Sequence, residues 1–133
     1  MIEYHPPIKV YIKPSPGKGL GVFAKYKIFK GEVFEICPLY DLEIEVGTPN
    51  QFLYNYRFLF PNSPNPEKNV VVWGYGSLYN HSNNPNADWR DHSTEFAFEY
   101  FARKDILIGE EICTWYGDED YWSSNDRKDI KII

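Results

Sequence analysis

A dense run of polar side chains, residues 79–89, has the composition of a binding or catalytic site. Its sequence is YNHSNNPNADW, in which four asparagines accompany His81 and Ser82. A buried amide without a hydrogen-bond partner costs roughly 1–3 kcal/mol, so these residues do not pack unaided into a core. Their donors and acceptors need either nearby backbone in a tight loop or a ligand with matching groups. We call residues 79–89 the polar run and keep both alternatives open.

Two further segments combine glycine with residue types that bind or react. Residues 18–21 read KGLG, and alternate glycines allow the backbone to approach a ligand closely. The spacing differs from G-x-G-x-x-G and no helical pattern follows, so this is neither a dinucleotide fingerprint nor a phosphate loop. Taken alone, the segment is equally compatible with a simple turn. The third segment runs from GEEI at residues 109–112 to Tyr116 and Gly117, where a tyrosine hydroxyl becomes available.

Read in this order and at these separations, the three segments resemble the signature motifs of SET-domain protein lysine methyltransferases. The Asn-His-Ser-x-x-Pro-Asn motif of the polar run is specific, and the resemblance covers roughly residues 8–122. It is closest to compact single-domain members of the chlorella-virus type, which this chain also resembles in its ending YGDEDYW at residues 116–122. The resemblance implies a mainly β fold, a SET domain of the β-clip type with short sheets around a knot-like C-terminal crossing. It also implies one SET domain over residues 1–133 without zinc-binding flanking domains.

The resemblance implies that S-adenosylmethionine is the cofactor. Asn80 is expected near its amino-acid part and His81 near its adenine, largely through backbone. Trp122 falls where compact members cover the adenine with an aromatic ring. The full set of residues implied to bind the cofactor is Lys18, Gly19, Leu20, Gly21, Asn80, His81 and Trp122.

Tyr116 occupies the position of the family's catalytic tyrosine, whose hydroxyl sits beside the methyl group and the target amine. Trp89 and Tyr56 are implied to line the lysine channel together with Tyr116, although each of these two rings is also compatible with an ordinary core position. Aromatic walls suit the reaction, because a lysine of unperturbed pKa about 10.4 must lose its proton before it attacks. Desolvation favours the neutral amine, and an aromatic pocket also attracts methylated ammonium groups.

Three positions depart from the family pattern. Asn83 stands where many members have a zinc-binding cysteine, and the histidines do not form a ligand spacing, so no metal is expected. Thr114 replaces the usual aromatic residue two positions before Tyr116, which leaves open whether one, two or three methyl groups are added. Trp115 replaces a common aspartate next to Tyr116.

Composition limits the classes of partner that this protein is expected to bind. The chain has a formal net charge of −5, which disfavours nucleic acid and suits a basic peptide or histone tail. Cys37 and Cys113 lie in separate apolar segments, a usage typical of a reduced intracellular protein. No segment approaches the length of a membrane span and no apolar signal region opens the sequence, so a soluble protein is expected, nuclear or chromatin-associated if its substrate is a histone. Compact relatives imply a homodimer as one arrangement.

Two non-enzymatic hypotheses stay open. The first is a catalytically inactive SET-like module that holds a basic peptide. The second is a small β protein whose aromatic residues, 18% of the chain, serve assembly. The presence of Tyr116 and of the Asn80-His81 pair favours the enzyme.

Short strands must position these segments. Apolar patterns predict strands over residues 8–13, 22–24, 33–37, 41–46, 70–73, 96–102 and 112–115. The 41–46 stretch alternates acidic and apolar residues, and the 70–73 stretch reads as fully buried. The aromatic segment 52–60 is compatible with either helix or strand. Many short strands without a long amphipathic helix or a repeat predict a mainly β domain.

Overall fold

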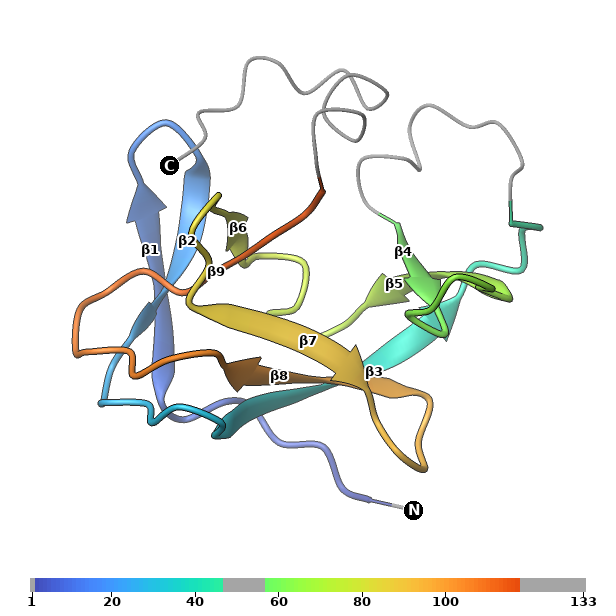
Figure 1. Cartoon of the computed structure of the whole chain (residues 1–133), viewed down its shortest axis with the longest axis horizontal. Coiled ribbons are helices and arrows are strands. Elements are labelled where there is room, and N and C mark those ends of the chain that lie inside the picture. Colours follow the sequence, from blue (N-terminus) through green and yellow to red (C-terminus); the bar gives the residue numbers. More distant parts are fainter. Residues whose placement is uncertain (1, 47–56, 118–133) are drawn as a thin grey trace.

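The computed structural model describes residues 2–46 and 57–117, and these residues form strands without any helix. The mainly β prediction is therefore confirmed. Nine strands follow one another along the described chain (Figure 1): β1 (Val10–Ser15), β2 (Gly19–Ala24), β3 (Val33–Asp41), β4 (Phe58–Phe60), β5 (Lys68–Val72), β6 (Asn80–His81), β7 (Ala87–Asp91), β8 (Ala97–Ala102) and β9 (Cys113–Thr114). Within the described ranges no helix is long and apolar enough to cross a membrane.

The largest sheet has the strand order β4-β5-β3-β8-β7. All its pairings are antiparallel, and β3 is long enough to pair with β8 along its first part and with β5 along its last three residues. Phe98 and Tyr100 on β8 are fully buried, as the alternation in the 96–102 stretch predicts. The largest sheet thus provides the buried apolar face against which the remaining elements pack.

Two small sheets complete the fold. β1 and β2 form an antiparallel hairpin, which joins the rest of the protein through bridges from Phe23 to Glu111 and from Ile28 to Ile106. β6 and β9 form a parallel pair in which Asn80 is the partner of Cys113, although the two residues lie far apart along the chain. Figure 1 shows this pair lying beside the β1-β2 hairpin and above β7. The three segments singled out from the sequence therefore converge at one side of the molecule.

Two strand predictions need correction. The 41–46 stretch is not a strand, because β3 ends at Asp41 and Glu43 has a positive φ of 58° that breaks an extended conformation. In its place, β3 continues beyond the predicted end at residue 37, since its last residues pair with β5. Trp73, predicted to be buried in a strand, follows β5 and is 51% exposed, with its ring against that of Tyr40.

Phe98 allows a direct test of the core. Replacing this fully buried ring by alanine should lower the free energy of unfolding by about 3–5 kcal/mol, because contacts are lost and a cavity remains. Phe29→Ala, at a ring that is 55% exposed, serves as the matched control and should change stability by no more than about 0.5 kcal/mol. Urea denaturation measures both. Equal effects of the two substitutions would contradict this description of the core.

Candidate active site

Asn86 fastens the polar run to the segment that leads into β9. Its side-chain amide donates to the Glu111 carbonyl oxygen at 2.8 Å, and its side-chain oxygen accepts the Cys113 N–H at 2.9 Å. The residue is buried, so both halves of its amide are satisfied by backbone rather than by water. The sequence left open whether the polar run is satisfied by nearby backbone or by a ligand, and Asn86 is satisfied by nearby backbone.

Asn80 connects the polar run to the glycine segment. Its amide nitrogen donates to the Leu20 carbonyl oxygen at 3.0 Å and to the Glu111 carboxylate at 2.8 Å. The other oxygen of that carboxylate accepts from the Ser15 hydroxyl at 2.9 Å. Gly21 lies against these groups, and a Cβ there would collide with the Glu111 carboxylate. Glycine at this position is therefore required by the close approach of three segments.

Lys18 makes a second connection, because its ammonium donates to the His81 carbonyl oxygen at 2.9 Å. The structure thus brings together Lys18, the 19–21 glycine segment, Asn80 and His81, all predicted to bind the cofactor. An ammonium, an amide and backbone carbonyls at the end of an open glycine turn fit the charged amino-acid part of S-adenosylmethionine. Gly19 has a positive φ of 78° and open space around it, so backbone is accessible there. Trp122 lies outside the described residues.

His81 is held in one tautomer by its two ring contacts. Its Nδ1 accepts the backbone N–H of Tyr116 at 2.8 Å, so Nε2 carries the proton and donates to the Asn83 side-chain oxygen at 3.0 Å. Burial lowers the pKa of His81; the Asn83 hydrogen bond opposes this change and the Lys18 charge adds to it. The ring is therefore neutral near pH 7, the state in which Nδ1 can hold the Tyr116 backbone.

The Tyr116 side chain points back to the start of the polar run, where its hydroxyl donates to the Tyr79 carbonyl oxygen. Its ring also lies 5.5 Å from that of His81. Tyr116 is thus positioned through both its backbone and its hydroxyl by residues of the polar run. The structure places the predicted catalytic hydroxyl at one defined point beside the predicted cofactor residues.

Tyr79 is itself immobilised by a residue that sequence reasoning missed. Its hydroxyl donates to the buried Glu35 carboxylate at 2.6 Å, and its ring stacks on Tyr100 with centroids 4.9 Å apart. Glu35 also accepts the Tyr75 N–H at 2.9 Å. Burial raises the pKa of Glu35, while these hydrogen bonds act in the opposite direction. A glutamate inside the apolar stretch VFEIC was the available signal, since a buried carboxyl group requires partners.

Trp89 lies on β7, half-buried, with its ring 5.3 Å from Phe58 and 6.0 Å from Tyr100. Tyr100 also stacks on Tyr79. Trp89 therefore belongs to the same aromatic cluster as Tyr79, whose carbonyl oxygen accepts from the Tyr116 hydroxyl. The packing of Trp89 agrees with the core interpretation. Because part of its side chain is exposed, its role in the lysine channel stays a prediction. Tyr56, the other predicted wall, lies outside the described residues.

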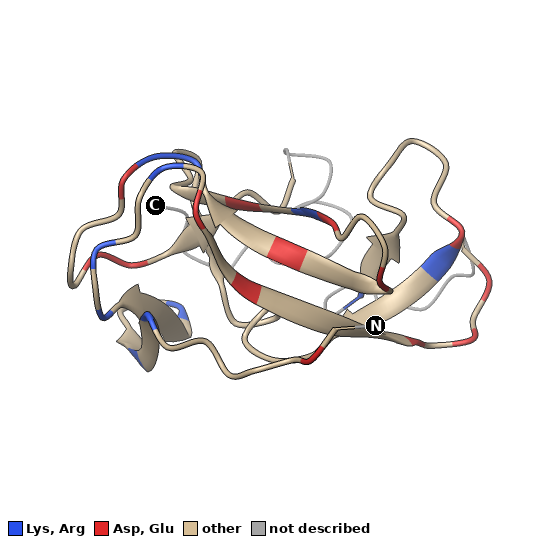
Figure 2. Cartoon of the chain, turned by 90° about the horizontal axis from the view of Figure 1, so that it is seen from below, with Lys and Arg blue, Asp and Glu red and all other residues tan. Residues whose placement is uncertain are grey.

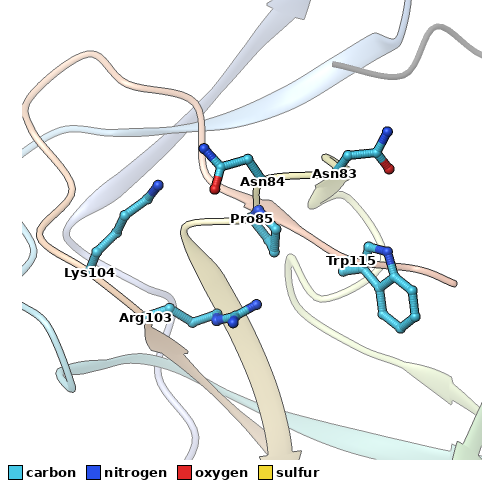
Figure 3. Close-up of a pocket in the computed structure, with 6 residues that line it drawn as sticks. All are labelled: Asn83, Asn84, Pro85, Arg103, Lys104 and Trp115. Carbon is cyan, nitrogen blue, oxygen red and sulfur yellow. The ribbon is translucent and has the colours of Figure 1, made fainter. Parts of the chain in front are cut away.

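The two residues before Tyr116 differ sharply in exposure. Thr114 is 1% exposed, and its carbonyl oxygen accepts the Ser82 N–H at 2.9 Å. Trp115 is half-exposed and faces a pocket of about 460 Å³ beside the predicted site (Figure 3). Among the described residues the pocket is lined by Asn83, Asn84, Pro85, Arg103, Lys104 and Trp115, and none of these is a predicted cofactor or catalytic residue.

Glu35 allows a test of how Tyr79 is held. Glu35→Leu removes the acceptor of the buried Tyr79 hydroxyl and of the partly buried Tyr75 N–H, and should lower the free energy of unfolding by about 2–4 kcal/mol. Glu35→Gln should cost less than half as much, because its amide can still accept from Tyr75 and donate to Tyr79. Urea denaturation compares both with Glu43→Gln, an exposed control. Indistinguishable stabilities for the Leu and Gln variants would exclude the hydrogen-bonding role of Glu35.

His81 should make stability pH-dependent. Its folded pKa lies below the unfolded value, so the unfolded chain binds the proton first and stability falls as pH drops below about 6.5. His81→Asn keeps an oxygen acceptor for the Tyr116 N–H but has no titrating group. The stability difference between the two proteins should therefore shift in favour of the variant between about pH 7.5 and pH 5.5. A pH-independent difference in urea titrations would contradict the assignment, and His5→Asn at an exposed histidine is the control.

Comparison with known proteins agrees with this geometry. The sequence model of the SET domain matches residues 19–117. A Schizosaccharomyces pombe protein, histone-lysine N-methyltransferase, H3 lysine-37 specific, is 30% identical over 123 residues that span 87% of this chain and 81% of that protein. A crystal structure of a candidate histone methyltransferase from Plasmodium falciparum has a TM-score of 0.65 at 33% identity, covering 84% of this chain and 95% of that one. The chain therefore belongs to the SET-domain family of protein-lysine methyltransferases.

Proposed function

We propose that this protein transfers a methyl group from S-adenosylmethionine to the side-chain nitrogen of a lysine in a histone tail. The observation that carries the proposal is the position of the Tyr116 hydroxyl, which donates to the Tyr79 carbonyl oxygen. The same residue is bonded through its backbone to His81, next to Asn80. One hydroxyl is thus held beside the residues that fit the cofactor.

S-adenosylmethionine would supply an activated methyl group on a positively charged sulfur. The Lys18 ammonium and the Asn80 amide are suited to its carboxylate and amino groups, and backbone around residues 19–21 is suited to close contact. His81 would contribute its backbone near the adenine, and Trp122 would cover that ring, as the family resemblance implies. The experimental readout for these residues is cofactor binding, which is separable from catalysis.

The target lysine must enter as a neutral amine. Burial between aromatic rings such as those of Trp89 and Tyr116 disfavours its protonated form, so the proton leaves to water before transfer. The nitrogen then attacks in line, forming the N–C bond as the C–S bond breaks and leaving a neutral thioether. The Tyr116 hydroxyl and the Tyr79 carbonyl oxygen would orient the amine, and this alignment supplies much of the acceleration.

A basic polypeptide is the substrate class that the charge distribution favours. The formal net charge of −5 attracts a lysine-rich tail. The name of the yeast relative, which specifies a lysine of histone H3, supports a histone. A histone substrate would place the protein on chromatin, and a homodimer is the assembly suggested by its resemblance to compact SET proteins.

Tyr116→Phe tests the proposal. Transfer of label from S-adenosylmethionine to a panel of core histones should fall by about 100-fold, because the amine loses its orienting hydroxyl. Cofactor affinity, measured by calorimetry, should stay within about threefold, since the ring and backbone remain. Tyr40→Phe, at an exposed tyrosine of β3, is the matched control and should keep full activity.

Two outcomes would overturn parts of the proposal. Absence of label transfer by the unaltered protein, with cofactor binding intact, would favour a module that binds a basic peptide without catalysis. Full activity of Tyr116→Phe would instead reject the role of the hydroxyl. Mass spectrometry of the labelled product identifies the lysine and the number of methyl groups.

A further inference from the structure

Two loops on the side of the molecule away from β4 and β5 are joined into one surface (Figure 1). Residues 25–32 connect β2 to β3, and residues 103–110 lie between β8 and β9. Ile28 and Ile106, both fully buried, exchange backbone hydrogen bonds of 2.9 and 2.8 Å. We call these two segments the loop pair. Its backbone is fixed from both sides, so a partner would meet a preorganised surface.

The loop pair exposes large apolar side chains. Gly109 N–H donates to the Ala24 carbonyl oxygen at 2.8 Å, so the antiparallel pairing resumes and places residues 25–27 opposite residues 107–108. Single exposed apolar residues are ordinary, whereas several on adjoining segments mark an interaction surface. Four side chains of the loop pair are more than half exposed: Tyr26 (53%), Phe29 (55%), Leu107 (55%) and Ile108 (70%).

The same surface is basic, in contrast to the chain as a whole. The loop pair contains five cationic residues, all exposed, and three carboxylates, whereas the whole chain carries −5. Figure 2 shows most Lys and Arg at the end formed by β1, β2 and the loop pair, whereas Asp and Glu are distributed over the whole molecule, this end included. The cationic residues of the loop pair are Lys25, Lys27, Lys30, Arg103 and Lys104.

Each of the three carboxylates accepts a backbone N–H within the loop pair, and two of them also form ion pairs, Asp105 with Lys27 (3.8 Å) and Glu32 with Lys9 (2.6 Å). The five cationic residues of the loop pair still outnumber its three carboxylates, so the surface stays basic. Two of the lysines lie near exposed rings, with Lys27 Nζ 4.9 Å from the Phe29 centroid and Lys25 Nζ 5.9 Å from that of Tyr26. The backbone bonds are Phe29 to Glu32 (3.1 Å), Lys30 to Asp105 (2.8 Å) and Leu107 to Glu110 (2.9 Å).

From these observations we infer that the loop pair is a docking surface for an acidic polypeptide segment that carries apolar side chains. Positive charge selects the acidic partner, and burial of Leu107 and Ile108 requires apolar groups that a nucleic-acid backbone does not offer. The partner is not the methylation substrate proposed above, because a basic tail would be repelled here. The inference stands whether or not that proposed activity is found.

The pocket beside the polar run extends this surface. Arg103 and Lys104 belong both to the loop pair and to the pocket lining, where they lie across from Asn83, Asn84 and the Trp115 indole (Figure 3). Guanidinium, ammonium and amide donors around one opening suit a carboxylate side chain. An acidic residue of the docked segment would enter the pocket while its apolar neighbours cover the loop pair.

Selection from a phage-displayed library of random dodecapeptides on the full-length protein tests the inference. Selected peptides should combine Asp or Glu with Leu, Ile or Phe, and their binding is then measured by fluorescence anisotropy. The double variants Leu107→Ser/Ile108→Ser and Lys25→Glu/Lys30→Glu should each weaken binding by about tenfold or more. Tyr40→Ser, at 55% exposure like Leu107, and Lys68→Glu on β5 are the matched controls and should bind as the unaltered protein does.

The outcomes separate the alternatives. Circular dichroism and thermal unfolding of each variant establish that it is folded before binding is compared. Selected peptides that bind all variants equally, or a library that yields no peptide dependent on these residues, would overturn the inference. Short duplex DNA that binds the protein, loses affinity in Lys25→Glu/Lys30→Glu and is indifferent to Leu107→Ser/Ile108→Ser would identify a nucleic-acid surface in its place. Loss of methyltransferase activity is not a readout here, so failure of the proposed function would leave this result unaffected.

Discussion

The parallel contact between β6 and β9 is the constraint on which the rest of the site depends. Two residues on each side form the pair, which alone is too short to be stable. It persists because side chains hold it from both directions, Asn86 through backbone of the β9 segment and Asn80 through the Glu111 carboxylate. The same carboxylate reaches Ser15 in the β1-β2 hairpin. The Glu111 carboxylate thus connects its own segment to the polar run and to the hairpin, in addition to the connections made by Asn86 and Lys18.

Hydrogen bonds of defined direction connect the β6-β9 pair to Tyr116 and hold this residue in place. His81 holds the Tyr116 backbone, and the Tyr79 carbonyl oxygen holds its hydroxyl. Tyr79 in turn rests on Glu35 and Tyr100, which belong to β3 and β8 of the largest sheet. The predicted catalytic hydroxyl is therefore connected to the rigid centre of the protein rather than to a mobile loop, which suits a reaction that depends on alignment.

The proposed substrate and the proposed docking partner carry opposite charges. The net charge of −5 suits a basic substrate, whereas the loop pair is basic and apolar. Trp89 lies on β7, whereas the loop pair connects β2 to β3 and follows β8. A basic tail and an acidic docking segment would therefore bind at different surfaces of the protein.

The sequence by itself determined the family, the mainly β class and which three segments meet, because motif spacing and apolar periodicity can be read directly from the chain. It also named Tyr116 and the Asn80-His81 pair as candidate site residues. It did not determine where β3 ends, since the last residues of that strand are stabilised by β5, some thirty positions later. The role of Glu35 was likewise hidden, because its partner Tyr79 is 44 positions away. The tertiary structure decided these points, since pairing partners and burial, unlike periodicity, exist only after distant segments have come together.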